Sequence, residues 1–344
     1  MHCQLLVPGF GWPQGDASEL CHALAPDALE TLIARGRRTS VSVSGPERWL
    51  FERFGVARRR DWPAAPFSLL ADGGSPGSDA WIRADPVHLR FERNRLLLLD
   101  STMFAIARDE AEALAGSINK HFGDGIIVRP LRTQRWYARL LDCPDMQTNA
   151  LSSVRGSAIE AALPHGPDAM RWQACINELQ MLLHDHPVNL AREARGELPV
   201  NSVWLWGAGR LPPPDRPPAR PFHYVAASDP LARGLAQASG AQAQELAANA
   251  RGFLAQAGHA GVGLAVLDSL AAPSQYGQAE AWREALLKLE RDWFAPLLAA
   301  LRQGAIGMLT VHLFGLEHAL QVEVTRSDLR RFWRRRRPLA GWLA

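Results

Sequence analysis

The sequence predicts a layered α/β fold that contains a smaller, compact α+β unit. The second half of the chain alternates strand-like apolar segments with amphipathic helical segments, which is typical of a largely parallel sheet with helices on its faces. Residues 81–141 instead predict two strands, a helix and two more strands, which is a compact α+β unit. The 344 residues, 47% of them hydrophobic and 21% charged, can form one large domain or two ordinary ones.

The first block of the chain predicts a strand, one or two helices, a second strand and a further helix. Residues 4–7 are an apolar run that a Pro-Gly pair ends, which favours a short buried strand. Residues 17–35 are helical in pattern with a break near Pro26, and residues 39–44 alternate as a strand does. A helix over 44–54 would have Ser44 as its N-cap and a proline in its first turn.

The α+β unit is predicted from five segments in a row. Residues 81–90 and 96–100 form a hairpin, 108–122 an amphipathic helix, and 125–130 and 135–141 two further strands. A run rich in glycine, serine and aspartate precedes them and is a natural boundary. These segments together form one compact α+β unit.

The remaining segments complete the core. Residues 168–185 predict a helix, 202–206 a strand that ends in glycines, and 211–221 a proline-rich surface loop. Residues 223–267 predict strand, helix, helix and strand, and 282–302 one long helix. A final hairpin follows, formed by 308–313 and 319–325, and then a short helix that ends in four arginines at 334–337.

Composition excludes several classes of protein. The formal net charge is only +3, which argues against a protein that coats nucleic acid, and lysine occurs only at positions 120 and 288. The four cysteines form no CxxC pair, which argues against a zinc knuckle or a disulfide framework. No signal peptide and no membrane-length apolar run is present, so we expect a cytoplasmic protein with no membrane partner.

The segment 177–209 gathers polar and aromatic side chains around a helix end, a turn and a strand end. Ligands of α/β sheets bind beyond the carboxyl ends of strands, so this cluster predicts a binding site or a contact surface. The alternative is structural: His184 caps a helix, while Asn189 and Asn201 bond to turns. With two residues from the α+β unit, the candidate ligand-binding set is Arg83, His88, His184, His186, Asn189, Arg192, Asn201, Trp204 and Trp206.

Two weaker signals remain. His184 and His186 form an HxH pair that would bind zinc or manganese only with a third ligand from elsewhere. The run 326–337 mixes arginines with Phe332 and Trp333, which can bind phosphates or stack on bases, although a solvated helix with docked aromatics is favoured.

Three motifs together resemble the RpfE-type regulatory proteins of proteobacteria: WIRADPVHL, NELQMLLHDHPVN and NSVWLWGAGRLP. More distantly, the chain is similar to archaeal-type cofactor-independent phosphoglycerate mutases of the alkaline phosphatase superfamily. Residues 81–141 resemble their cap, and HPVN…R and WLWGAG match two segments that follow the cap in the same order. The resemblance implies a superfamily-like α/β core made of residues 1–78 and 146–344, with a cap domain inserted over 79–145.

The mutase mechanism needs two divalent metals and a serine or threonine nucleophile. The resemblance implies an Asp-Gly metal ligand where this chain has Val7-Pro8-Gly9, and a histidine is missing after Asp268. We therefore expect a regulatory or ligand-sensing protein without the bimetal centre and without a cofactor, which binds a small anion through Arg83 and Arg192 or a protein partner. An active mutase or phosphomonoesterase is the alternative, with manganese or zinc held by Asp229, His259, Asp268 and His312. A second alternative is an interaction module for nucleic acid or protein at the arginine-rich C-terminus.

Overall fold

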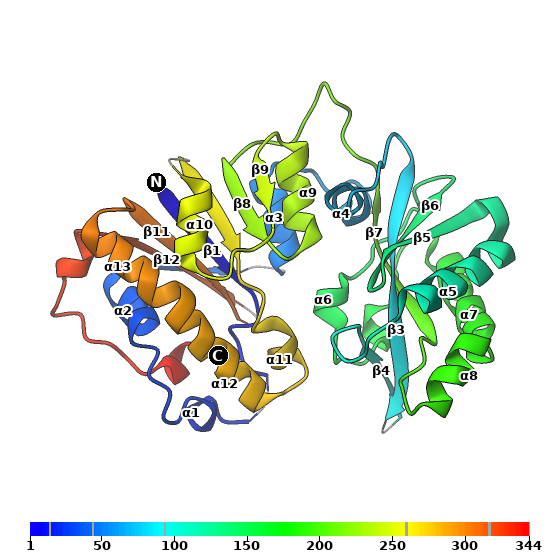
Figure 1. Ribbon diagram of the computed structural model, residues 1–344, viewed down its shortest axis with the longest axis horizontal. Helices are drawn as coiled ribbons and strands as arrows, with labels where there is room; N and C mark the ends of the chain where they lie inside the picture. The colour runs from blue at the N-terminus through cyan, green and yellow to red at the C-terminus, as the bar shows by residue number, and fades with distance from the viewer. Residues whose placement is uncertain (14, 43–44, 93, 259–260, 316–317, 344) are drawn as a thin grey trace. The chain divides into compact units, whose positions relative to one another are not determined.

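The computed structural model describes the chain from residue 1 to 343, except residues 14, 43–44, 93, 259–260 and 316–317 (Figure 1). The chain folds into two compact units. Unit 1 consists of Met1–Gly55 and Ala219–Ala344, and unit 2 consists of Val56–Pro218. Unit 2 is therefore an insertion in the chain of unit 1, as the sequence predicted for a smaller domain.

Unit 1 is built on a seven-stranded sheet with the order β2-β12-β11-β1-β10-β8-β9. Its strands are β1 His2–Val7, β2 Arg37–Ser42, β8 Tyr224–Ala227, β9 Gln242–Gln244, β10 Val262–Val266, β11 Met308–Phe314 and β12 His318–Thr325. The five strands from β11 to β9 are parallel, and β12 is antiparallel to both of its neighbours. The predicted parallel core and the final hairpin are both confirmed.

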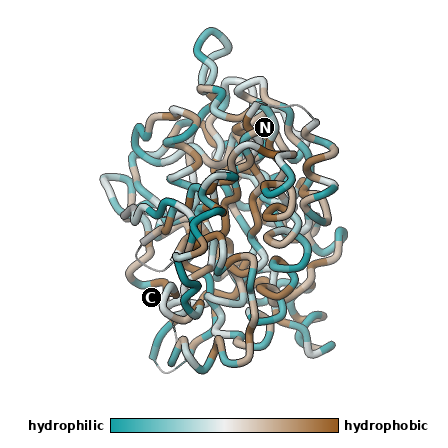
Figure 2. Tube along the Cα trace, turned by 90° about the vertical axis from the view of Figure 1, so that its left-hand side faces the viewer, coloured by the Kyte–Doolittle hydropathy of each residue, from teal (hydrophilic) through white to brown (hydrophobic). Residues whose placement is uncertain are grey.

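Helices cover both faces of this sheet because its strands are buried on both sides. Alternate residues of β11 show the two faces: Val311 belongs to the apolar core with the helices that follow β10, whereas His312 lies against Trp49 of α3. The helices of unit 1 are α1 Ala17–Leu20, α2 Asp27–Arg35, α3 Pro46–Arg53, α9 Pro230–Ala238, α10 Ala250–Ala257, α11 Ala271–Gln275, α12 Ala279–Leu289 and α13 Ala295–Gln303. In the trace of Figure 2, hydrophobic residues gather mostly toward the interior, and many of the outer loops are hydrophilic.

Two predictions for unit 1 need correction or refinement. The long helix is present, but a π-helical segment at Glu290–Phe294 joins α12 to α13. The expected C-terminal helix through the arginine run is wrong: a 3₁₀ turn at Asp328–Arg330 is followed by irregular chain up to a second 3₁₀ turn at Leu339–Trp342. Successive arginines repel one another along a helix, which disfavours helix there. The proposed N-cap Ser44 lies outside the described residues.

Unit 2 contains an antiparallel sheet in which β3 has three partners. The strands are β3 Ala80–Glu92, β4 Arg95–Leu99, β5 Ile126–Arg132, β6 Arg135–Leu140 and β7 Ser202–Gly209. One edge of β3 pairs with β6 and then with β4, while the other edge pairs with β7. The predicted strands of the inserted unit are therefore confirmed, and the strand over 202–206 joins their sheet.

Helices pack on both faces of this sheet (Figure 1). Helices α5 Arg108–Phe122 and α7 Ala169–His184 cover one face, where Trp136 and Trp172 fill the core. Helix α4 Ala64–Ala71 covers the other, where its Leu69 meets Trp81. Two shorter helices, α6 Leu151–Val154 and α8 Pro187–Ala194, complete the unit. The sequence pattern predicted neither α4 nor α8.

The expected cap over 79–145 lies wholly inside unit 2. The unit also contains α4 before that segment, and α7, α8 and β7 after it. Among the helices described, none is long and apolar enough to cross a membrane.

Candidate functional site

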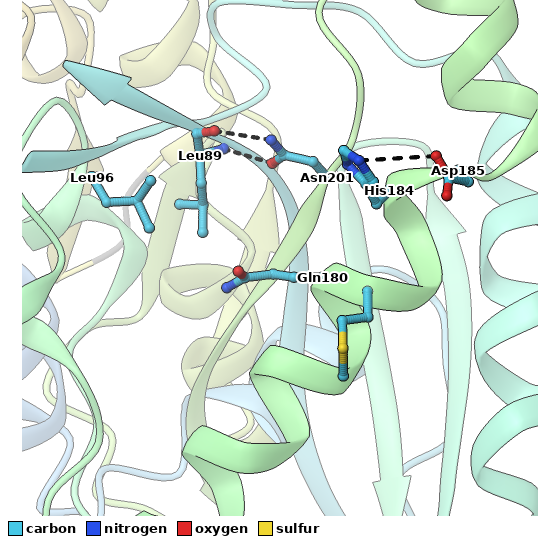
Figure 3. Close-up of a pocket in the computed structure, with 7 residues that line it drawn as sticks. Leu89, Leu96, Gln180, His184, Asp185 and Asn201 are labelled. Atoms are coloured by element: carbon cyan, nitrogen blue, oxygen red, sulfur yellow. Dashed lines mark hydrogen bonds and ion pairs between the residues drawn. The ribbon is translucent and has the colours of Figure 1, made fainter.

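A pocket of about 550 Å³ lies in unit 2 between the C-terminal end of α7 and the strands β3 and β4 (Figure 3). It combines apolar side chains with amide, imidazole and carboxylate groups. Its lining residues are Leu89, Leu96, Gln180, Met181, His184, Asp185 and Asn201. Two residues of the predicted ligand-binding set, His184 and Asn201, therefore line one pocket.

Asn201 forms one wall of this pocket but uses its amide on the protein backbone. Its Oδ1 accepts the N–H of Leu89 at 2.7 Å, and its Nδ2 donates to the Leu89 carbonyl oxygen at 2.9 Å (Figure 3). His88 makes a similar link, because its Nδ1 lies 2.9 Å from the carbonyl oxygen of Pro199. These two side chains hold the chain before β7 against β3, so Asn201 bonds to a strand and not to a turn.

His184 places an imidazole ring in the lining of the pocket. It ends α7, and its side chain is 82% exposed beside the equally accessible Asp185, with 3.9 Å between Nε2 and Oδ1. Cations are favoured at a helix C-terminus. Gln180, one turn earlier, adds an amide that extends toward the pocket (Figure 3). A small ligand with polar oxygens would find both donors here.

His186 lies outside the pocket and begins the next helix. Its Nδ1 accepts the N–H of Val188 at 3.2 Å as the N-cap of α8, and its Nε2 lies 2.9 Å from the hydroxyl oxygen of Ser117. Burial lowers its pKa below the ordinary histidine value. The ring is therefore a neutral cap, and both nitrogens that a metal would use already have partners.

Asn189 and Arg192 bind α8 to its surroundings. Asn189 donates to the carbonyl oxygens of Leu183 and Val200 at 2.7 and 2.9 Å, and it accepts the N–H of Val200. Arg192, whose side chain is 2% exposed, donates from Nε to Leu198, from Nη1 to Glu110 and from Nη2 to Ala105. An anion at Arg192 would have to displace one of these acceptors, so its predicted ligand contact stays a prediction.

Arg83 is buried in a second group of polar side chains, on β3. Its Nη2 donates to Asp85 at 2.6 Å, and Trp206 Nε1 donates to the other carboxylate oxygen of Asp85 at 2.7 Å. The guanidinium lies 5.1 Å from the ring centroid of Tyr137 and 5.2 Å from that of Trp206. Neither Arg83 nor Arg192 is among the residues that line the pocket of Figure 3. Trp204, nearby, donates from Nε1 to the carbonyl oxygen of Asn149 at 2.8 Å.

Asp72 continues this buried polar group and was missed by the sequence analysis. Arg135 binds it through two parallel hydrogen bonds of 2.8 and 2.7 Å, and the hydroxyl of Tyr137 donates to it at 2.7 Å. Burial raises the pKa of Asp72, but these hydrogen bonds outweigh it and the net pKa lies below the ordinary value. The alternation of Arg135 and Tyr137 along one strand was the signal that both side chains share a face.

The four metal-ligand candidates belong to unit 1. Asp229 and Asp268 follow the neighbouring parallel strands β8 and β10, so both lie at the carboxyl edge of the sheet. Asp229 Oδ1 already accepts the N–H groups of Leu231 and Ala232 as the N-cap of α9. His259 lies outside the described residues.

His312 is a core histidine on β11. Its ring centroid lies 4.7 Å from that of Trp49, and its Nε2 lies 3.2 Å from Oε1 of Gln4. Burial, reinforced by the charge of Arg53, lowers its pKa to about 3. Among the residues that the structure describes, no group of three or more histidine, cysteine or acidic side chains is placed to hold a metal ion. The described donors therefore do not fit a two-metal centre.

The carboxyl end of the central strand β1 is closed by packing. Gly9 has a φ of +78°, and a Cβ there would lie 2.4 Å from the Cα of Ala271 in α11. Trp282 Nε1 donates to the carbonyl oxygen of Gly9 at 2.9 Å. Only glycine fits this approach. The turn after β1 therefore presents Pro8 and a backbone that is already bonded.

Comparisons with known proteins supply a family relationship for part of the chain. No protein-family model matches the sequence. A 2,3-bisphosphoglycerate-independent phosphoglycerate mutase of Methanothrix thermoacetophila is 32% identical over 120 residues, which are 35% of this chain and 29% of that protein. The mutase of Methanosarcina mazei is 39% identical over 59 residues, or 17% of this chain and 15% of that protein. Part of this chain is homologous to phosphoglycerate mutases.

A solved structure shares the fold of this chain. The PH0037 protein of Pyrococcus horikoshii superposes with a TM-score of 0.57 at 12% identity, over 94% of this chain and 87% of that chain. The predicted fold class, a layered α/β core with a smaller α+β insertion, is confirmed. The sequence matches span less than a third of either mutase, so activity and substrate remain to be proposed.

Proposed function

We propose that this chain is a cytoplasmic regulatory or ligand-sensing protein of the RpfE type. It has the mutase-like fold without the bimetal phosphoryl-transfer centre. The observation that carries the proposal is the end of β1, where Val7-Pro8-Gly9 replaces the Asp-Gly ligand that the mutase resemblance implies. Proline has no side-chain donor, and α11 packs against the following glycine.

The other candidate metal ligands support the same proposal, because their side chains already have structural partners. Asp229 caps a helix, and His312 is a neutral ring packed on Trp49. A metal would have to displace these partners, and fold-level likeness alone does not transfer the chemistry of a relative. The alternative, an active mutase or phosphomonoesterase, rests on the sequence similarity to the two mutases.

Metal retention tests the proposal. The purified protein is incubated with manganese or zinc, desalted and measured by mass spectrometry, and turnover of 3-phosphoglycerate and of a phosphomonoester is assayed in parallel. We expect no turnover of either substrate, and no retained metal whose binding requires Asp268. Two retained equivalents, with turnover that Asp268→Asn removes, would overturn the proposal. Metal that Asp268→Asn retains equally is bound elsewhere and does not support a mutase centre.

The sensor part of the proposal places a small anion in the pocket of Figure 3. His184 would supply an imidazole donor, and Gln180 an amide donor. 3-Phosphoglycerate should raise the melting temperature of the wild type, and His184→Gln should reduce this thermal shift. His22→Gln, an exposed histidine of unit 1, is the matched control. Equal shifts in both variants would contradict this ligand site.

A further inference from the structure

A second pocket, in unit 1, is lined mainly by charged side chains. It has a volume of about 540 Å³. Four arginines and two carboxylates face it, and its lining residues are Gly36, Arg37, Arg38, Met308, Glu323, Thr325, Asp328, Arg331 and Arg334. We call it the arginine pocket.

The arginine pocket lies at the end of the sheet opposite the carboxyl edge. Met308 begins β11, and it pairs with Thr325, which ends the antiparallel β12. Arg37 begins β2 and pairs with Glu323. The carboxyl edge, where Asp229 and Asp268 lie, is formed by the other ends of these parallel strands. The pocket is therefore separate from every site considered above.

Two of the four arginines are neutralised within the pocket. Arg37 forms an ion pair with Glu323, and Arg331 forms one with Asp328 at 3.0 Å. Asp328 is further occupied, because it accepts the N–H and the hydroxyl of Thr325 at 2.9 and 2.7 Å. Both carboxylates of the lining thus already have cationic partners.

In the part of the chain that the structure describes, the other two arginines form no ion pair, although the charge of Arg334 helps to lower the pKa of Asp328 from a longer distance. The guanidinium of Arg38 lies 4.9 Å from the ring centroid of Trp342, and Arg334 donates from Nη1 to the carbonyl oxygen of Gly36 at 3.1 Å. A stacked guanidinium keeps its in-plane N–H donors, and Arg334 has donors beyond the one in use. The lining therefore has an excess of two positive charges with free donors.

We propose that the arginine pocket binds a small phosphate-bearing anion. A phosphate group accepts paired hydrogen bonds from guanidiniums and balances the two excess charges. The volume suits a small molecule, since such pockets measure about 300–1,000 Å³. Arg38 and Arg334 bind the phosphate, while the Arg37–Glu323 and Arg331–Asp328 pairs form the walls.

Two exposed aromatic side chains stand between lining arginines in the sequence. Phe332 and Trp333 are 79% and 65% exposed, with 5.3 Å between their ring centroids. The sequence favoured a solvated helix whose aromatic side chains pack on the core, but Phe332 and Trp333 are exposed. Single-stranded nucleic acid also uses arginine with exposed aromatics, so it is tested as a competing outcome. The small volume of the pocket and its excess of only two positive charges favour the small anion.

Pyrophosphate is the probe that tests the proposal. Calorimetric titration at low salt should show binding to the wild type, and Arg38→Gln with Arg334→Gln should weaken it at least about tenfold. Arg251→Gln removes an exposed arginine elsewhere in unit 1, on α10, and should change the affinity less than about twofold. Arg334→Gln alone loses one hydrogen bond to a carbonyl, so it tests the pocket without risk to the fold. Melting of each apo variant checks that it is folded.

Three results would overturn the proposal. These are no pyrophosphate binding by the wild type, equal losses in Arg251→Gln and Arg334→Gln, or binding of a thymidine oligonucleotide where pyrophosphate fails. His184→Gln should leave pyrophosphate binding unchanged, because His184 belongs to unit 2. Failure of the arginine pocket and failure of the proposed function are thus measured on different variants.

Discussion

Arg192 and Glu110 form a buried ion pair that joins α8 to the first turn of α5. Arg192 Nη1 lies 2.5 Å from Oε2 of Glu110, and the two side chains are 2% and 13% exposed. Glu110 also accepts the N–H of Ala107 and a bond from Arg195. One carboxylate therefore bonds to two arginines and to the backbone at the start of α5.

The ion pair predicts that Arg192→Ala lowers the free energy of unfolding by about 3 kcal/mol, since it leaves a buried carboxylate with fewer partners. A pure ligand contact would instead leave the fold intact. Denaturant unfolding decides between the two interpretations. The control is Arg195→Ala, whose side chain is 48% exposed and binds the same Glu110, and it should cost less than about 1 kcal/mol. Equal costs for the two variants would contradict the buried link.

The lowered pKa of Asp72 leads us to expect that unit 2 loses stability in acid. Its folded-state pKa lies below the unfolded value of about 3.9, so the ionised form stabilises the fold and this stability is lost as pH falls below about 4. Asp72→Asn should lower stability at neutral pH by about 2 kcal/mol and flatten that acid slope. Unfolding by urea at several pH values measures it. Asp142→Asn, at a side chain 96% exposed, should keep the wild-type slope.

The close approach of β1 to α11 predicts that Gly9→Ala is costly. The new Cβ would meet the Ala271 backbone at 2.4 Å, and the positive φ adds strain, so we expect a loss of about 2–4 kcal/mol. Gly240→Ala is the matched control in the same unit: its φ is +74°, but no atom lies within 4 Å of the added Cβ. It should lose only about 1 kcal/mol. Thermal unfolding that ranks the two variants equally would show that packing at Gly9 is unimportant.

The cysteines predict slow thiol chemistry in the folded protein. Burial raises the pKa of Cys3 and Cys175 to about 12 and that of Cys21 to about 11, and it also raises the pKa of Cys143. Thiolate is the reactive form, so alkylation at pH 8 should be far slower than for an unfolded cysteine. All four should react at once in guanidinium chloride. A single fast thiol in the native protein would contradict the prediction for that residue.

The strands and the long amphipathic helices could be predicted from the sequence, because their apolar residues recur at clear strand or helix spacing. Helix α5 was predicted at its observed bounds, Arg108–Phe122. Helix α4 escaped because its residues AAPFSLLA are apolar on nearly every side, so no amphipathic period marks them. The terminal arginine run was interpreted as a helix because local pattern does not report repulsion between neighbouring charges.

The candidate site was harder to predict, because the sequence around a polar residue does not show whether its side chain binds a ligand or the protein backbone. Asn189 and Asn201 belong to the predicted cluster, yet among the described residues their amides bond to the main chain. Asp72 and Arg135 are 63 positions apart, and only the folded sheet brings them together. The arginine pocket likewise joins residues from both ends of the chain.

The insertion of unit 2 determines the order in which the two units can fold during translation. β1 pairs with β10 and β11, which begin at Val262 and Met308. Unit 2 ends at Pro218, so all of its sequence is translated before either partner of β1 exists. Domains fold as units while synthesis proceeds. The nascent chain must therefore carry the apolar strand β1 without its sheet partners, with unit 2 already translated, until β10 is made.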